Sequence, residues 1–374
     1  MSSMSSLQDW YRVSNTEEID SPALLLYEDR IDENLRRMVE QAGGVDRLRP
    51  HIKTHKIPEI LQKHLALGIS RFKVATIAEA EMCACAGALD VLLAYPPVGP
   101  RAGRLALLAR KFPKVRFSVA LDDASVAEGL SRVAFQCGVT LGALLDIDCG
   151  QHRTGIAPGP EAVELYQLFA RLPGLRPEGI HVYDGHIHDS DVALRGQRCE
   201  EAFQPVAALR EQLELAGLSV PTVVAGGTPT FPFHARRPHV ECSPGTCVFW
   251  DQGYATHFPD LDYLPAAVLL TRVISKPLSN RLCLDLGHKA VASEMPQPRV
   301  HLLNLPDAVF VGHNEEHLMI ETDRAGDFPI GSVLYALPTH VCPTVALHSE
   351  VAVIRNGHAS ARWRVVARDR RLTV

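Results

Sequence analysis

Arg49-Pro50-His51-Ile52-Lys53-Thr54-His55-Lys56 is the stretch from which the rest of the chain is best interpreted. It holds three lysine or arginine side chains, two imidazoles and a proline. An apolar run (22–27) and an amphipathic helix pattern (31–42) precede it. A lysine at a strand end inside an apolar protein can act as an amine nucleophile. Because a basic stretch is also typical of a solvated loop or an anion site, the surrounding pattern must decide between these interpretations.

Outward from this stretch, short apolar runs alternate with helical patterns. Strands are expected at 22–27, 49–51, 71–76, 90–95, 116–121, 141–148, 178–185, 221–227 and 239–242. Helices are expected at 77–87, 100–111, 123–136, 160–171 and 195–216. Continuous apolar strands separated by helices indicate a parallel sheet that is buried on both faces. The strand count favours an α/β fold of the (β/α)8 TIM-barrel type over residues 21–254.

The pattern changes near residue 255. From there to residue 374, runs rich in β-branched residues alternate with turn residues, and no helix of useful length is expected. This pattern predicts a C-terminal, mainly antiparallel β domain over 255–374. Residues 1–20 form a polar lead-in.

Composition limits the kind of partner. With 374 residues, 46% of them hydrophobic, the chain is long enough for two domains. Its net charge of -5 and the absence of a polybasic tract argue against nucleic acid as a partner. No apolar segment is long enough to span a bilayer, and the start of the chain does not resemble a secretory signal. Nine scattered cysteines predict reduced thiols and a cytoplasmic location.

Polar residues gather where the expected strands end, which is where barrel enzymes carry their chemistry. LLDIDCGQHRTG (144–155) contains Arg153, and HVYDGHIHD (181–189) contains Tyr183, His186 and His188. Arg153 is either a surface arginine or a fixed donor to a cofactor ring oxygen or a substrate carboxylate. His186 is a candidate base, whereas His188 is expected to be an ordinary strand-end histidine.

Two later strand ends combine glycine with hydroxyl side chains. They are AGGTPT (225–230) and SPGT (243–246). Glycine lets backbone N–H groups approach a phosphate closely, and threonine can donate a further hydrogen bond. An ordinary turn is the alternative. The candidate phosphate ligands are Gly226, Gly227, Thr228, Gly245 and Thr246.

A possible metal site lies in PTHVCPT (338–344) of the second domain. If this segment is a strand, His340 and Cys342 face the same side and can both bind one divalent metal. An imidazole with a thiolate favours zinc, although manganese, magnesium or cobalt remain open. Two core residues on a buried strand are the alternative. Nearby, His317 in NEEH (314–317) could act as an acid or base, or lie in a solvated turn.

Together these motifs resemble those of the D-threonine aldolase and D-serine dehydratase family. These are fold-type III enzymes that use pyridoxal 5'-phosphate (PLP) and are related to alanine racemase. The resemblance extends from about residue 22 to about residue 355 and includes RPHIKTHK, TIAEAEMCACAGALDVLLAY, DIDCGQHRTGI, YDGHIH, GGTPTF, SPGT and PTHVCPT. One departure is Cys247, where many relatives have tyrosine.

The resemblance implies a PLP-binding barrel, a C-terminal β domain and a homodimer. It implies that Lys53 binds PLP, that Arg153 contacts the cofactor or substrate, and that Tyr183 lies near the pyridine nitrogen. The glycine and threonine residues named above would hold the phosphate, and His340 with Cys342 would hold the metal.

The implied reaction is a lyase reaction on a small D-β-hydroxy amino acid such as D-serine, D-threonine or 3-hydroxy-D-aspartate. Dehydration to a keto acid and ammonia is favoured because the His-x-Cys pair resembles the dehydratase branch. Retro-aldol cleavage, with His186 or His317 as base, is the alternative. A racemase and a non-catalytic PLP-binding protein are less favoured.

Overall fold

The computed structural model describes residues 9–374, so the first eight residues of the expected lead-in lie outside it. The chain divides into two compact units. The barrel unit comprises Met38–Lys53, Pro58–Gly245 and Asp369–Val374. The sheet unit comprises the described residues up to Arg37, together with Thr54–Ile57 and Thr246–Arg368.

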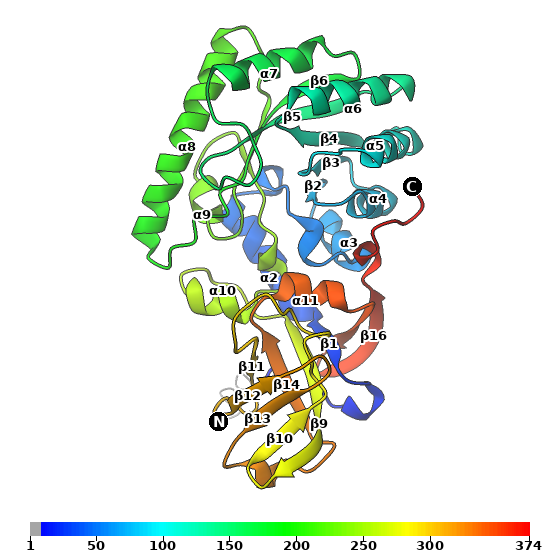
Figure 1. The fold of residues 1–374 in the computed structure, drawn as a ribbon, viewed down its shortest axis with the longest axis vertical. Helices are drawn as coiled ribbons and strands as arrows, with labels where there is room; N and C mark the ends of the chain where they lie inside the picture. The colour runs from blue at the N-terminus through cyan, green and yellow to red at the C-terminus, as the bar shows by residue number, and fades with distance from the viewer. Residues whose placement is uncertain (1–8) are drawn as a thin grey trace. The chain divides into compact units, whose positions relative to one another are not determined.

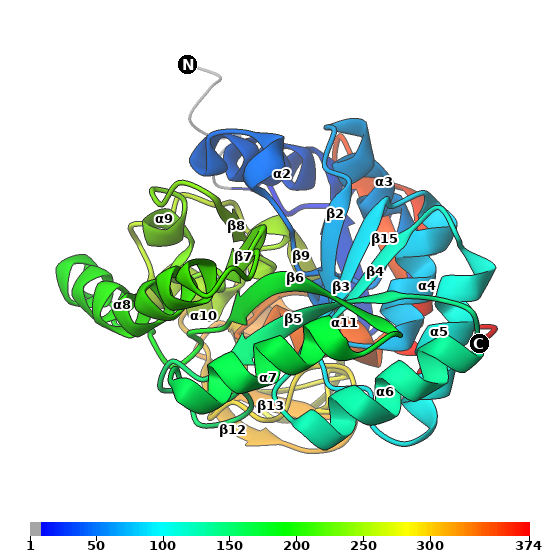
Figure 2. The same cartoon turned by 90° about the horizontal axis from the view of Figure 1, so that it is seen from above.

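The barrel unit contains a parallel seven-stranded sheet in the order β2 to β8. Its strands are β2 (Arg71–Val74), β3 (Asp90–Leu93), β4 (Arg116–Leu121), β5 (Leu141–Ile147), β6 (Leu175–Val182), β7 (Thr222–Ala225) and β8 (Val240–Cys242). Residues 48–51 close the ring, because Arg49 N–H donates to the Cys242 carbonyl on one edge while Lys73 N–H donates to the Pro50 carbonyl on the other. Figure 2 shows the strands in this ring with helices outside them. The expected parallel barrel is confirmed.

The helices of the barrel begin where the sequence supplies capping groups. The Thr76 side chain accepts a hydrogen bond from Glu79 N–H at the start of α4. In the same way, the Asp123 side chain accepts from Val126 N–H at the start of α6, and the Asp191 side chain accepts from Leu194 N–H at the start of α8. The helices are α3 (Pro58–Ala66), α4 (Ile77–Ala86), α5 (Pro100–Lys111), α6 (Ala124–Gln136), α7 (Pro160–Arg171), α8 (Val192–Leu215) and α9 (Phe231–His234). Helix α2 (Glu28–Ala42) precedes the barrel strands in the chain.

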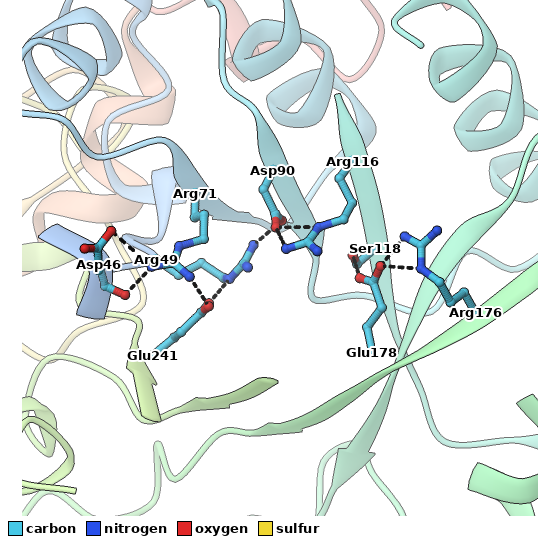
Figure 3. Close-up of polar contacts among 9 residues, drawn as sticks. All are labelled: Asp46, Arg49, Arg71, Asp90, Arg116, Ser118, Arg176, Glu178 and Glu241. Carbon is cyan, nitrogen blue, oxygen red and sulfur yellow. Dashed lines mark hydrogen bonds and ion pairs between the residues drawn. The ribbon is translucent and has the colours of Figure 1, made fainter. Parts of the chain in front are cut away.

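Inside the barrel, side chains lie in layers. At the N-terminal ends of the strands is a charged cluster, which we call the basal network and show in Figure 3. Its members are Asp46, Arg49, Arg71, Asp90, Arg116, Ser118, Arg176, Glu178 and Glu241. Arg49, which is buried, lies 2.6 Å from both Asp90 and Glu241. The middle layer is apolar and consists of Leu92, Leu144 and Val224 from alternate strands. This apolar layer separates the basal network from the C-terminal ends of the strands.

The sheet unit is a mixed, mainly antiparallel sheet, as the sequence predicts (Figure 1). Its strands are β1 (Ala23–Tyr27), β9 (Ala267–Leu278), β10 (Arg281–Leu284), β11 (Val300–Leu302), β12 (Val309–His313), β13 (Leu318–Glu321), β14 (Val333–Pro338), β15 (Glu350–Arg355) and β16 (His358–Arg364). Their order is β12-β13-β10-β9-β1-β15-β16, with β14 also on β9 and β11 on β14. Leu25, Val268 and Tyr335 are among the residues of its core.

Two features of this unit differ from the sequence-based expectation. Strand β1 was expected within the barrel region 21–254, but it pairs with β9 and, in parallel, with β15. An apolar run such as ALLLY fits either sheet, so its pattern does not specify the partner. Helices α10 (Gln252–His257) and α11 (Val341–Leu347) occur where the β pattern predicted no helix of useful length. Among residues 9–374, no helix has the length and apolar character needed to cross a membrane.

Candidate active site

Three cationic side chains of the barrel unit converge on one aromatic ring. Lys53 Nζ lies 5.9 Å, Lys73 Nζ 5.3 Å and the Arg153 guanidinium carbon 5.0 Å from the centre of the Tyr183 ring. They come from the chain after residue 51, from β2 and from the loop after β5. The structure thus brings together the predicted residues Lys53, Arg153 and Tyr183, and adds Lys73.

Glycines leave the space that the Tyr183 ring occupies. A Cβ on Gly185 would lie 2.4 Å from Tyr183 Cε1, and a Cβ on Gly227 would lie 3.0 Å from Cε2. Larger residues at these positions would displace the ring. The glycines of YDG and GGT therefore position an aromatic surface as well as backbone N–H groups.

Lys73 belongs to a buried chain of polar side chains that the sequence did not reveal. Its Nζ lies 3.2 Å from His181 Nε2, and His181 Nδ1 lies 2.6 Å from Asp146 Oδ1. All three residues are buried. Because a carboxylate accepts the Nδ1 proton, Nε2 carries the lone pair that accepts a hydrogen bond from Lys73. Burial and the neighbouring Lys73 lower the pKa of His181, consistent with a neutral ring.

The predicted phosphate ligands of the barrel unit lie at the ends of β7 and β8. Gly245 N–H donates to Thr228 Oγ1 at 3.2 Å, and Gly226 adopts a left-handed φ of +75°. A Cβ on Gly226 would lie 2.5 Å from the His234 ring, so only glycine fits there. Ser243 Oγ is buried and has no hydrogen-bond partner within residues 9–374. An unsatisfied buried hydroxyl beside glycine turns fits a phosphate-bearing ligand.

A second polar cluster lies behind these turns. His234 Nε2 is 2.7 Å from Asp184 Oδ2, and Cys199 Sγ is 3.5 Å from His234 Nε2. Burial would raise the pKa of Asp184, but His234 and Thr230 lower it. The three side chains lie close enough to hold a metal ion. However, Arg237 Nη1 lies 3.0 Å from His234 Nδ1, so a cation is already present and the ring hydrogen bonds are satisfied.

His186 and His317, the two predicted bases, have different surroundings. His186 belongs to the barrel unit, and its Nδ1 is buried without a hydrogen-bond partner in the described part of the chain. His317 lies in the exposed turn between β12 and β13, where its carbonyl accepts from Asn314 N–H. His317 therefore fits the solvated turn that was the alternative interpretation. His188 is exposed, as expected of a residue with no role in the site.

His340 and Cys342 lie together in the sheet unit, but not on a strand. Strand β14 ends at Pro338, His340 is the N-cap of α11, and Cys342 lies in the first helical turn. The expected strand geometry is therefore wrong, although the imidazole and the thiol still form a hydrogen bond. Their proximity results from the helix start, where Val341 N–H donates to Asp251 Oδ2 at 2.9 Å.

The surroundings of this pair suit a metal ligand set. Glu294 Oε1 lies 2.6 Å from His340 Nδ1 and fixes the orientation of the ring, so Nε2 would be the atom that binds a metal. Cys342 Sγ lies 3.2 Å from Thr54 Oγ1 and 3.6 Å from Thr246 Oγ1. A nitrogen and a sulfur donor with a carboxylate-fixed imidazole fit zinc or a similar divalent ion.

The structure also shows the surroundings of Thr246 and Cys247, two residues of the sheet unit that the sequence analysis singled out. Thr246, a predicted phosphate ligand, is buried beside Cys342. Cys247, the departure from the family pattern noted above, is buried and hydrogen-bonded with Tyr263. Burial and this thiol raise the pKa of the Tyr263 hydroxyl.

A parallel barrel that carries a lysine after its first strand, followed in the chain by a β-sheet unit, defines the alanine racemase-like class of enzymes. Residues 27–252 match the alanine racemase N-terminal domain, and residues 266–354 match the putative serine dehydratase domain. The chain belongs to the family of D-threonine aldolases and D-serine dehydratases, and the resemblance stated from its motifs is confirmed.

The individual relatives span both branches of the family. D-threonine aldolase from an Arthrobacter species is 31% identical over 94% of this chain and 93% of its own. The structure of D-threonine aldolase from Filomicrobium marinum has a TM-score of 0.87 at 30% identity, covering 94% of this chain and 96% of that chain.

The dehydratase branch is represented by D-threo-3-hydroxyaspartate dehydratase from Delftia sp. HT23. Its structure has a TM-score of 0.80 at 27% identity, covering 92% of this chain and 97% of that chain. A cysteine-to-alanine variant of D-threo-3-hydroxyaspartate dehydratase has also been solved in the metal-free form, with a TM-score of 0.80, 26% identity and the same coverage.

Proposed function

We propose that this protein is a PLP- and divalent-metal-dependent dehydratase that converts a D-β-hydroxy amino acid to a keto acid and ammonia. The observation that supports dehydration is the His340/Cys342 pair, with Glu294 2.6 Å from His340 Nδ1. A thiol ligand is consistent with the metal-free cysteine variant of the related dehydratase. In the balanced reaction, the substrate loses water from Cα and Cβ, and hydrolysis of the resulting enamine releases ammonia.

The residues at the C-terminal end of the barrel fit PLP. Lys53 would hold its aldehyde carbon, and Arg153 would donate to its ring oxygen or to the substrate carboxylate. The phosphate would be held by Gly226, Gly227, Thr228, Gly245 and Thr246, together with the unpaired hydroxyl of Ser243. When bound, PLP supplies an electron sink for the bonds of the substrate α-carbon.

Different side chains of the protein have different roles in the proposed reaction. Lys53 Nζ, as a free amine, takes the proton from the α-carbon of the substrate. His340 Nε2 and Cys342 Sγ would hold the metal, which as a Lewis acid makes the β-hydroxyl a better leaving group. Arg153, near the Tyr183 ring, fixes the orientation of the anionic substrate.

Retro-aldol cleavage to glycine and an aldehyde is the second candidate. It is supported by the 31% identity to D-threonine aldolase over most of both chains. In this reaction a base must remove the proton of the β-hydroxyl. His186 is a candidate for this base, because its buried Nδ1 has no hydrogen-bond partner within residues 9–374.

Incubation of the PLP-loaded and zinc-loaded protein with D-threonine separates the two candidates. The dehydratase proposal predicts 2-oxobutyrate and ammonia in equal amounts. Glycine with acetaldehyde would overturn it in favour of the aldolase. If neither product forms from D-threonine, D-serine or 3-hydroxy-D-aspartate, the lyase proposal itself fails.

We further expect a homodimer in the cytoplasm. None of the nine cysteines, all of which lie within residues 9–374, forms a disulfide bond, as expected in a reducing compartment. Light scattering of the purified protein tests the oligomeric state, and a mass equal to one chain would contradict it.

A further inference from the structure

The carboxylate of Asp184 is the centre of a buried network that the proposed reaction does not use. Asp184 is 3% exposed and lies two residues after the end of β6. Its Oδ1 accepts a hydrogen bond from Thr230 Oγ1 at 2.8 Å, and its Oδ2 lies 2.7 Å from His234 Nε2. Thr230 and His234 are also buried and belong to the segment that follows β7. Because burying a carboxylate is costly, its presence at this point calls for a role.

This network connects the segment after β7 to the end of β6 at two points. At the start of the segment, Gly226 N–H donates to the Val182 carbonyl at 3.0 Å. At its other end, the Thr230 hydroxyl donates to Asp184. Between these points, Gly227 N–H donates to Thr230 Oγ1 at 3.3 Å, so a single hydroxyl connects the buried carboxylate to the glycine turn. The path of the turn is therefore fixed by its contacts with the end of β6.

The side chains of the network also pack directly against the turn. A Cβ on Gly226 would lie 2.5 Å from His234 Cδ2 and 2.9 Å from Thr230 Oγ1. The His234 ring is held at its other nitrogen as well, because Arg237 Nη1 lies 3.0 Å from Nδ1. Burial would raise the pKa of Asp184, but His234 and Thr230 lower it, which is consistent with an ionised carboxylate that accepts from both partners. The turn thus lies against a rigid polar support.

We propose that Asp184, Thr230 and His234 are positioning residues that hold the turn of residues 226–228 in the conformation that receives a phosphate. This inference rests on the proposed function, which places the PLP phosphate at this turn. The three side chains act through the turn and need no contact with the ligand. A turn that is already ordered loses less conformational entropy when the phosphate binds, and so binds it more tightly. Because Gly245 N–H donates to the threonine hydroxyl of this turn, the SPGT turn is held in place as well.

The first test compares the affinities of cofactor-free protein for PLP and for pyridoxal, which lacks the phosphate, by the visible absorbance of the bound ligand. Thr230→Val removes the hydroxyl but keeps the shape of the side chain, so the affinity for PLP should fall about tenfold while the affinity for pyridoxal stays the same. Thr230→Ser retains the hydroxyl and should bind PLP within about twofold of wild type. Asp184→Asn removes the charge at the centre of the network and should cause the same selective loss as Thr230→Val.

The matched control is Thr271→Val in the sheet unit. Thr271 is buried, and its Oγ1 donates to Asp285 Oδ1 at 2.6 Å, as Thr230 does to Asp184. Thr271→Val and Thr230→Val should therefore both lower the melting temperature, because each leaves a buried carboxylate without one donor. Only Thr230→Val should change the ratio of PLP affinity to pyridoxal affinity. An unchanged ratio in Thr230→Val would overturn the proposal, because the network would then have a structural role alone.

The second test uses inorganic phosphate without PLP, and so separates failure of this proposal from failure of the proposed function. At constant ionic strength, phosphate should raise the melting temperature of wild-type protein and of Thr271→Val by more than that of Thr230→Val. An equal rise in all three proteins would reflect the general effect of phosphate on stability and would contradict the proposal. If PLP does not bind but phosphate still distinguishes Thr230→Val from wild type, the proposed function fails and the role of the network is retained.

Discussion

The two ends of the barrel use cationic side chains in different ways. At the N-terminal end, Arg49, Arg71 and Arg116 of the basal network are each paired with a carboxylate. At the C-terminal end, Lys53, Lys73 and Arg153 face the uncharged Tyr183 ring. Arg49 is buried between two carboxylates, whereas the three cations at the C-terminal end form no ion pair with a carboxylate within residues 9–374 and are suited to bind an anionic ligand. The difference distinguishes structural from functional charge within one barrel.

The RPHIKTHK motif itself contains both kinds of charge. Burial would lower the pKa of Arg49, but Glu241 and Asp90 raise it, so this arginine is a fixed structural cation. Lys53, four residues later, faces the aromatic ring of the candidate site. In the sequence these residues form a single basic cluster. In the structure, the extended backbone of residues 48–51 places Arg49 at one end of the barrel and Lys53 at the other.

Replacement of Lys53 tests the functional end and should have the largest effect. Lys53→Ala should abolish the visible absorbance of bound PLP, because the amine that would bind the cofactor is lost. Turnover should fall by at least about 10⁴-fold, because the same amine is the proposed general base. The melting temperature should change little. An unchanged spectrum would remove Lys53 from the cofactor site.

Removal of the metal tests whether the sheet unit supplies a separate part of the chemistry. Chelation, or His340→Ala, should lower turnover on the order of 10³-fold, because Lewis-acid assistance is worth several kcal/mol. The absorbance of bound PLP should persist, and zinc should restore activity to chelated wild-type protein but not to the variant. Full activity after verified metal removal would contradict the assignment.

Replacement of Arg49 tests the structural end. Arg49→Met leaves Asp90 and Glu241 without one buried partner and should lower the free energy of unfolding by about 3–5 kcal/mol in urea. The folded variant should still bind PLP. Arg110→Met, exposed on α5, is the control and should change stability by less than about 0.5 kcal/mol. Loss of PLP binding by folded Arg49→Met would remove the distinction between the two ends.

Ser243 gives the smallest expected effect and sharpens the same distinction. Because its hydroxyl has no partner in the described chain, Ser243→Ala should leave stability unchanged while weakening PLP binding about tenfold. Ser131, whose Oγ accepts from Gly174 N–H, is the matched control. Ser131→Ala should cost about 1–3 kcal/mol of stability without changing PLP affinity. The opposite pattern would exclude Ser243 from the phosphate site.

Local patterns in the sequence predicted most of the fold, because a buried parallel strand and an amphipathic helix have distinct periods. The expected strand at 116–121 and the helix at 160–171 match β4 and α7. The partner of β1 was not predictable, since sheet membership depends on β9 and β15, which lie far along the chain. For the same reason, α11 was missed: its short apolar run also fits a strand, and its N-terminus is fixed by the distant Asp251.

The candidate site was predicted where a motif carries its own chemistry and missed where contact depends on the fold. Lys53, Arg153, Tyr183 and the glycine turns belong to recognisable local motifs. Lys73 resembles an ordinary strand residue in the sequence, and only the barrel brings it to His181 and Asp146. Ser243 lies inside the SPGT motif, but its missing partner is visible only in the structure.

The most direct test of the central claim is to locate the cofactor on the chain. PLP-loaded protein is reduced with borohydride, digested and mapped by mass spectrometry. The account predicts that the pyridoxyl group is on Lys53 and that Lys73 is unmodified. A pyridoxyl group on Lys73, or on a lysine outside the C-terminal end of the barrel, would contradict it.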